Sequence, residues 1–392
     1  MPANDLNSSP SPPKVDAQIP PQVLVLDGGF GSQLEALGYA VDKSEVWSGG
    51  ALIEEPELVR KCHQSEQPVL VLSGGFGSQL EALGYAVDND TNREFINAGA
   101  DIIETNTYHL CIKKLRECRG YSVEQAESLV KLAVQIARDA ISSSGRSVQL
   151  VGSVGPYATY LRDGSEYTGD YVKKPDFNEQ IIIDYYLSQC RPLIAAGIRT
   201  LVFETIPTLK EVECVGKVLD QLGQEVRAWI VSTCQVKGYQ SDSLFFARRR
   251  NGNYGIEKRV EEWGEKFGRR PTDGKRTRSG DLFSSVVKVA NSIQKVLAVG
   301  VNCTAPENIT ELLEEANKTG NRKALVVYPN SGEIWNPVLQ QFQGATQIEM
   351  IASLIPHWYL LGARIFGGCC RVMPDHIARI GIVCDKLKAK ST

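Results

Sequence analysis

Two adjacent cysteines, Cys369 and Cys370, follow a short apolar run and two glycines in the sequence GARIFGGCCRVMP (residues 362–374). A third cysteine, Cys303, ends another apolar run in VGVNCTAP. Zinc prefers thiolate ligands, and three protein ligands leave one tetrahedral position open, as in catalytic zinc sites. If both runs are strands that end at the same edge, the three sulfurs meet in space. The cysteines therefore predict a catalytic zinc site.

Other interpretations of these cysteines stay open at this point. Most of the ten cysteines in the chain fit a role as small buried hydrophobic residues. The adjacent pair also fits a vicinal disulfide in a redox protein. Because the spacing of the cysteines is irregular and no secretory signal precedes them, we expect no disulfides in this chain.

The elements that must position these residues are eight apolar runs that alternate with helical patterns. One of these helices is predicted at residues 122–140, where Ser122 and Gln125 form a capping box before a helical spacing of apolar residues. The alternation predicts a single (β/α)8 TIM barrel, with its chemistry at the carboxyl ends of the strands. The predicted strands are residues 23–29, 100–108, 147–156, 200–207, 227–234, 297–303, 324–330 and 363–369.

Three segments do not fit the regular barrel. Residues 1–22 are rich in Pro, Ser and Asn and are predicted to be a disordered tail, so the barrel would occupy residues 23–392. Insertions are predicted at about residues 65–93 and 238–272. The first contains a near-copy of residues 23–42 at residues 69–88, in which Ser73 replaces Asp27. Because the first copy keeps the acid, we expect it to form the barrel strand.

Composition excludes several classes of partner. The net charge of −3 gives no general attraction to nucleic acids or to anionic membranes. The basic insertion at residues 238–272 comes without a recognition motif or an aromatic platform for bases. No run approaches the roughly 20 apolar residues of a membrane helix. These features predict a cytoplasmic enzyme with no nucleic-acid or membrane partner.

Seven motifs in order give the chain a resemblance to the homocysteine S-methyltransferases, nearest to the plant type that uses S-methylmethionine. The resemblance covers about residues 23–378, apart from the two insertions. It implies a zinc-dependent barrel with Cys303, Cys369 and Cys370 as ligands, and homocysteine bound by Asp27 and Glu204. The motifs are LDGGFGSQLEALG, GADIIETNTY, GSVGPYATYLRDGSEYTGDY, FETIP, GVNCTAP, VVYPNSGE and GARIFGGCCR.

The resemblance also implies the reaction. The homocysteine thiolate would attack the methyl group of a sulfonium donor and become methionine. Asp27 and Glu204 would hold the ammonium group through charge-assisted hydrogen bonds, and the amides of Gly28 and Gly29 would take the carboxylate. S-methylmethionine is the expected donor, S-adenosylmethionine is a second candidate, and betaine fits less well. In the loop at residues 158–171 and beside it, three tyrosines would face the sulfonium or simply pack, and they are Tyr157, Tyr160 and Tyr167.

Departures from the family pattern leave two alternatives. Because both insertions are absent from that pattern, the chain is alternatively an inactive or unstable variant of the enzyme. A redox protein with a Cys369–Cys370 disulfide is the other alternative. The chain stops soon after the CCR motif, without the C-terminal extension by which betaine-using relatives assemble, so we expect a monomer.

Overall fold

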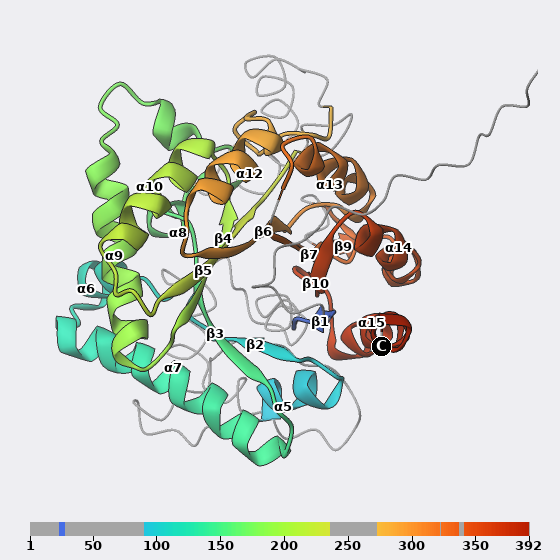
Figure 1. Ribbon diagram of the computed structural model, residues 1–392. Coiled ribbons are helices and arrows are strands. Elements are labelled where there is room, and N and C mark those ends of the chain that lie inside the picture. Colours follow the sequence, from blue (N-terminus) through green and yellow to red (C-terminus); the bar gives the residue numbers. More distant parts are fainter. Residues whose placement is uncertain (1–22, 28–89, 236–272, 322, 337–340, 392) are drawn as a thin grey trace, which may run out of the picture.

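Eight parallel strands form the centre of the computed structural model, which describes residues 23–27, 90–235, 273–321, 323–336 and 341–391 (Figure 1). Their order is β1-β10-β7-β6-β5-β4-β3-β2. The two outermost strands meet at a parallel bridge between Leu26 and Ile102, so the sheet closes into the predicted (β/α)8 barrel. The strands are β1 (Leu24–Val25), β2 (Ile102–Glu104), β3 (Gln149–Val154), β4 (Thr200–Ile206), β5 (Arg227–Ser232), β6 (Val296–Asn302), β7 (Ala324–Tyr328) and β10 (Ala363–Phe366).

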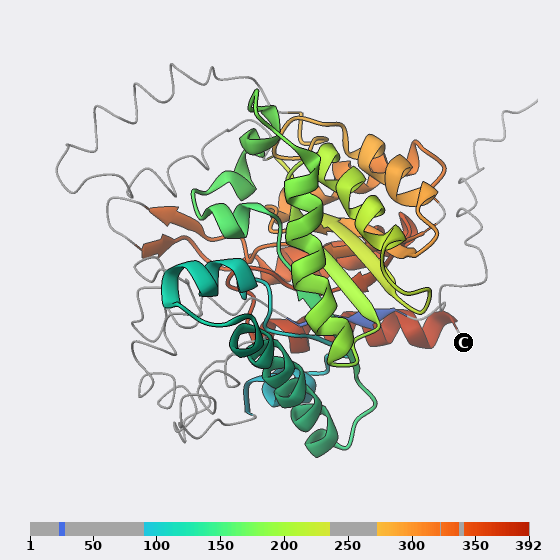
Figure 2. The same ribbon diagram turned by 90° about the vertical axis from the view of Figure 1, so that its left-hand side faces the viewer.

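Helices surround the strands, as Figure 2 shows from the side. The capping box predicted for α7 is present, because the side chains of Ser122 and Gln125 each accept the backbone N–H of the other. The longer helices are α5 (Asp90–Asn97), α6 (Ile112–Arg119), α7 (Val123–Ser144), α9 (Glu179–Ala195), α10 (Leu209–Asp220), α12 (Phe283–Ser292), α13 (Ile309–Asn317), α14 (Ile348–Leu360) and α15 (Pro374–Ser391).

Several short elements were not predicted from the sequence. The loop after β3 contains three helical turns, α8 (Ala158–Leu161), η3 (Ser165–Tyr167) and η4 (Asp170–Lys173), and η6 (Pro306–Asn308) precedes α13. After β7 comes an antiparallel hairpin, β8 (Ile334–Asn336) and β9 (Gln341–Gln343). No helix was predicted at α14, which contains Pro356.

The core has two layers, one inside the barrel and one between the strands and the helices. Since successive side chains of a strand point to opposite faces, alternate residues fill each layer. All eight strands contribute to the inner layer, which contains Leu26, Ile102, Val151, Val202, Trp229, Val231, Ala298, Ala324, Val326, Tyr328 and Ile365. The barrel is therefore a packed core rather than a pore, and chemistry is confined to its ends.

The first copy of the repeated sequence supplies β1, as predicted. Its Val25 and Leu26 are buried in the barrel, and Asp27 is buried at the strand end. The second copy, the predicted tail at residues 1–22 and the insertion at residues 238–272 lie outside the described residues. Of the insertion at residues 65–93, only residues 90–93 are described, and they begin α5. Among the described helices, none is long and apolar enough to cross a membrane.

Candidate active site

Three cysteines meet at the carboxyl ends of β6 and β10. The sulfur atoms of Cys303, Cys369 and Cys370 all lie within 4.8 Å of one another, and 3.9 Å separates the sulfurs of Cys303 and Cys370. Thiolates bound tetrahedrally to one zinc ion are about 3.8 Å apart, given zinc–sulfur bonds of about 2.3 Å. The Cys303–Cys370 distance and the soft donor set therefore fit a single zinc ion once all three thiols are reduced.

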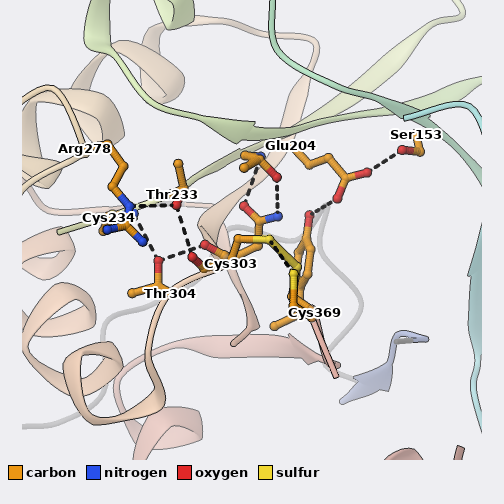
Figure 3. Close-up of a disulfide and its surroundings, with 12 residues drawn as sticks. Ser153, Glu204, Thr233, Cys234, Arg278, Cys303, Thr304 and Cys369 are labelled. Atoms are coloured by element: carbon orange, nitrogen blue, oxygen red, sulfur yellow. Dashed lines mark hydrogen bonds between the residues drawn. A yellow bond between two sulfur atoms is a disulfide. The ribbon is translucent and has the colours of Figure 1, made fainter. Parts of the chain in front are cut away.

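The same cluster corrects two expectations about disulfides. Cys303 and Cys369 are joined by a disulfide, so the expectation that the chain has none is wrong for this pair (Figure 3). The partner of Cys369 in this bond is Cys303 rather than Cys370, so the bond differs from the vicinal Cys369–Cys370 disulfide of the redox interpretation. The physical reason is proximity, because β6 and β10 bring Cys303 as close to Cys369 as a disulfide requires.

Cys303 is held by its backbone in an unusual conformation. Its φ of 45° lies in the left-handed region that disfavours side chains with a Cβ. The Thr233 hydroxyl donates to the Cys303 carbonyl at 3.2 Å, and the neighbouring Thr304 hydroxyl donates to the Asn302 carbonyl at 2.8 Å. Of the four described residues other than glycine with positive φ, three lie here, namely Thr205, Cys303 and Arg371. Strain of this kind concentrates at functional sites.

The other two cysteines are positioned by close contact between β10 and β1. A Cβ added to Gly367 would lie 2.7 Å from the Leu26 Cβ, so only glycine allows this approach. The Gly368 N–H donates to the Asp27 carbonyl at 3.1 Å. The GG of GGCC therefore places Asp27 directly beside the cysteine pair.

An ion pair lies immediately beyond the cysteines. Arg371 donates to Glu333 at 2.9 Å, and Glu333 also accepts from the Ser331 hydroxyl. The Ser331 N–H in turn donates to the Cys370 carbonyl at 3.0 Å. The segment after β7 is thus tied to the cysteine turn by one continuous set of contacts.

Carboxyl groups from three other strands form the second part of the site. Asp27 and Glu204, both predicted, are 2% and 6% exposed, which is low enough that neither is a surface acid. A third acid, Glu104 at the end of β2, donates its N–H to Asp27 Oδ2 at 3.2 Å. Its side chain is also hydrogen-bonded to Glu204. Gly28 and Gly29, predicted to bind a carboxylate, lie outside the described residues.

Burial controls the ionisation of this group. It raises the pKa of Glu204 to about 7, although hydrogen bonds with Ser153, Glu104 and Tyr328 lower it. It also raises the pKa of Glu104 well above its usual range, and the neighbouring Glu204 and Asp27 add to this effect. Removing carboxylates from water disfavours their charged form unless a cation is present. The cluster is therefore suited to a positively charged ligand.

Polar contacts connect the acids with the cysteines. Ser153 donates to Glu204, as Figure 3 shows, and Tyr328 donates to it at 3.4 Å. Next to Glu204, the Thr205 N–H donates to Asn302 Oδ1 at 3.0 Å, and Asn302 Nδ2 donates to the Thr205 hydroxyl at 2.8 Å. Because Asn302 precedes Cys303, this pair fixes the end of β4 relative to the cysteine cluster.

The tyrosines of the loop after β3 mostly contact protein groups. The ring of Tyr160 faces the Lys113 ammonium, 4.4 Å from the ring centre, so a protein cation already occupies the role proposed for the sulfonium. Tyr157 packs edge-on against Tyr171 and Tyr185. The guanidinium of Arg278 lies 5.5 Å from the Tyr167 ring centre. Packing is thus the interpretation that these contacts favour.

Sequence reasoning missed Glu104 and Asn302. Asp27 and Glu204 were assigned through the family resemblance, whereas the signal for Glu104 is its place as an acid at the end of the apolar run ADIIE. Asn302 offered only its position before Cys303. Its contact with Thr205 spans 97 residues, and no local pattern predicts such a pairing.

Comparisons with known proteins agree with this geometry. The family model described as homocysteine S-methyltransferase matches residues 70–383. Homocysteine S-methyltransferase 1 of Arabidopsis thaliana is 30% identical over 91% of both chains, and a betaine-homocysteine S-methyltransferase of Drosophila melanogaster is 29% identical over 94% of this chain and 96% of its own. The metallated form of the homocysteine methyltransferase MmuM from Escherichia coli matches with a TM-score of 0.64 and 26% identity, over 92% of this chain and 96% of that one.

The family match begins inside the second copy of the repeat, whereas the barrel strand comes from the first copy. The two copies differ only at Asp27 and Ser73, so sequence similarity hardly separates them. Strand pairing does separate them, because Leu24 and Val25 pair with Ile365 and Phe366. We therefore take the first copy as the strand of the site.

Proposed function

Because this chain belongs to the homocysteine S-methyltransferase family, it is a methyltransferase that acts on homocysteine, and we propose that it does so with zinc and a sulfonium donor. The observation that carries the proposal is the meeting of three cysteine sulfurs with buried acids at one end of the barrel. The cysteine sulfurs suit a metal and a thiol, and the buried acids suit an amine.

Cys303, Cys369 and Cys370 would hold the zinc as thiolates, with the disulfide between the first two reduced. A bound zinc would lower the pKa of a coordinating thiol, so homocysteine sulfur would be a thiolate near neutral pH. Three protein ligands leave a position for that sulfur. The strained turn at Cys303 and its hydrogen bond from Thr233 would keep the sulfur atoms oriented toward a common point.

Asp27 and Glu204 would bind the homocysteine ammonium. Their burial removes competing water, and the backbone contact between Asp27 and Gly368 sets the acid beside the cysteine turn. Charge-assisted hydrogen bonds of this kind are roughly twice as strong as neutral ones. The substrate would therefore be held at both ends, with its thiol at the cysteines and its amine at the acids.

We choose S-methylmethionine as the methyl donor, with S-adenosylmethionine as the second candidate. A site that combines thiolates with carboxylates is net negative and attracts a cationic sulfonium. The resemblance of the sequence motifs to the plant type supports this choice, whereas the Drosophila relative carries betaine in its name. The methyl group would pass in one displacement, in which the sulfur–carbon bond to homocysteine forms as the bond to the donor sulfur breaks.

Donor competition tests this proposal. Reduced protein purified with zinc is incubated with homocysteine and equal concentrations of S-methylmethionine, S-adenosylmethionine and betaine, each with a different isotope label in its methyl group. Labelled methionine should come mainly from S-methylmethionine. Methionine formed mainly from betaine would refute the donor choice.

Methionine from no donor, in protein that holds one zinc per chain, would favour the alternative of an inactive variant.

We further propose that the enzyme is a cytoplasmic monomer. Light scattering after gel filtration measures the mass, and a value of twice the chain mass would refute the monomer.

A further inference from the structure

Glu104 is an acid at the mouth of the barrel to which the family resemblance gave no role. It ends β2, directly beside β1, and its N–H contacts Asp27 Oδ2. Its side chain is hydrogen-bonded to Glu204, which comes from the far side of β3. Its remaining carboxyl oxygen, Oε1, is buried without a hydrogen-bond partner. Such an oxygen is costly unless a ligand supplies a donor.

The surroundings of Glu104 contain acids and phenols but no described cation. Asp27 faces it from β1, Glu204 from β4 and Tyr328 from β7, and Tyr108 lies near Glu204. Among the described residues, no lysine or arginine is hydrogen-bonded or paired with Glu104 or Glu204. Buried carboxyl groups this close to one another disfavour joint ionisation unless a positive charge enters.

An ammonium group has three N–H donors, and three carboxyl groups converge here from β1, β2 and β4. We propose that Glu104 is a further substrate-binding residue that completes a three-carboxyl receptor for the homocysteine ammonium. This inference depends on the proposed function, since it places the amine of the same substrate. Asp27 and Glu204 would each accept one N–H, and the unpartnered Glu104 Oε1 would accept the third.

The inference is tested by removing the amine from the ligand and the carboxylate from Glu104, each separately and both together. Full-length protein, reduced and supplied with zinc, is titrated by calorimetry at pH 8 with homocysteine and with 4-sulfanylbutanoate. The second ligand has the same thiol and carboxylate but lacks the amine. At pH 8 homocysteine keeps its ammonium. The variants are Glu104→Gln, Glu104→Asp as the charge-conserving change, and Glu315→Gln as a control for removing a buried acid.

Glu104→Gln should weaken homocysteine binding about 10- to 150-fold, the range for a lost charged hydrogen bond, and should change 4-sulfanylbutanoate binding by less than about threefold. Glu104→Asp should recover part of the loss. Glu315 lies on α13, where it pairs with Lys318, so its variant should bind both ligands as the wild type does.

Three results would overturn the inference. Equal losses for both ligands in Glu104→Gln would mean that Glu104 acts through the fold, and unchanged binding of both would mean that it does not contact the amine. If Glu104→Gln fails to fold, the comparison rests on Glu104→Asp, which should still prefer homocysteine to 4-sulfanylbutanoate, and loss of that preference would refute the role. A wild-type protein that binds neither ligand would refute the proposed homocysteine site itself, which separates that failure from failure of the Glu104 role.

Discussion

Strand β2 has an acid at each end, and the two acids differ in their partners. Asp101, just before the strand, accepts hydrogen bonds from the Val25 N–H at 3.2 Å and from Lys388 at 3.0 Å, and it lies 3.7 Å from Arg146. Glu104, at the other end, contacts two further acids and leaves one buried oxygen unpartnered. Asp101 is paired with cations of the protein itself, whereas the cation that we propose for Glu104 is the ammonium of the substrate.

The same difference extends around the barrel. At the amino ends of the strands, basic side chains donate to backbone carbonyls, as Lys295 does to Leu219 and Leu222. This arrangement recurs at the start of four other strands, with Arg199, Arg227, Lys323 and Arg364. The carboxyl ends instead hold thiols, buried acids and strained turns. One end of the barrel is thus built for stability and the other for binding and chemistry.

Removing a cysteine at the carboxyl end should have the largest effect. Cys370→Ala leaves two thiols, too few for a catalytic zinc site, so bound zinc and methionine formation should both be lost. The barrel should stay folded, because its core is hydrophobic and independent of the metal. Zinc content by mass spectrometry and circular dichroism check this expectation.

Cys214→Ala is the matched control, since Cys214 is equally a cysteine but lies buried on α10 with its pKa raised by burial to about 12. That variant should keep its zinc. Full activity of Cys370→Ala in protein without zinc would contradict the account.

Removing a carboxylate from the same end should come next. Glu204→Gln removes one charged partner of the homocysteine ammonium, which costs about 1.5–3 kcal/mol or about 10- to 150-fold in affinity. The KM for homocysteine should rise by that factor at pH 8, while the KM for the donor changes little. An unchanged KM for homocysteine would remove Glu204 from the site.

The size of that effect should depend on pH. Since the pKa of Glu204 is raised to about 7, the carboxyl is increasingly protonated below pH 7 and then resembles the neutral amide of Gln. Wild-type affinity for homocysteine should fall as pH decreases, by at most about tenfold per unit for one proton. The ratio of KM between Glu204→Gln and wild type should therefore shrink from pH 8 to pH 6. A ratio that is constant over this range would argue against a titrating Glu204.

At the amino end, the expected effect is on stability alone. Asp101→Asn removes the charge that pairs with Lys388 and Arg146 but keeps an oxygen for the Val25 N–H. Because these pairs are partly exposed, the free energy of unfolding should fall by only about 1 kcal/mol. Urea unfolding measures this change, and KM for homocysteine should stay within about twofold. A large rise in KM would show that the two ends are not separate in function.

The barrel could be predicted from sequence because its signals are local. Each strand is an apolar run, and most of the helices that follow have their own spacing or cap, as at Ser122. The cysteine cluster was also accessible, since parallel strands end at one edge and Cys303 and Cys369 each follow such a strand. A single residue indicated which copy of residues 23–42 forms the barrel strand, because only the first copy has an acid at the end of the strand.

What could not be predicted depends on contacts between distant segments. Asn302 is hydrogen-bonded to Thr205, 97 residues away, and the carbonyl of Cys303, whose backbone is left-handed, accepts from Thr233, 70 residues away. The Cys303–Cys369 disulfide was missed because we judged the oxidation state from cysteine spacing and the lack of a secretory signal, although the strand ends already predicted that these thiols meet. Lys113 on α6 lies over the ring of Tyr160 in the loop after β3, and no spacing in the sequence indicates this contact.

The central claim is that the carboxyl end of the barrel binds homocysteine through its sulfur at the three-cysteine site. X-ray absorption at the zinc edge measures the sulfur ligands of the zinc directly in reduced, zinc-loaded protein. We predict three sulfur ligands without substrate and four after homocysteine is added, with no change after 4-aminobutanoate, which lacks the thiol. A ligand set that stays the same when saturating homocysteine is present would contradict the account.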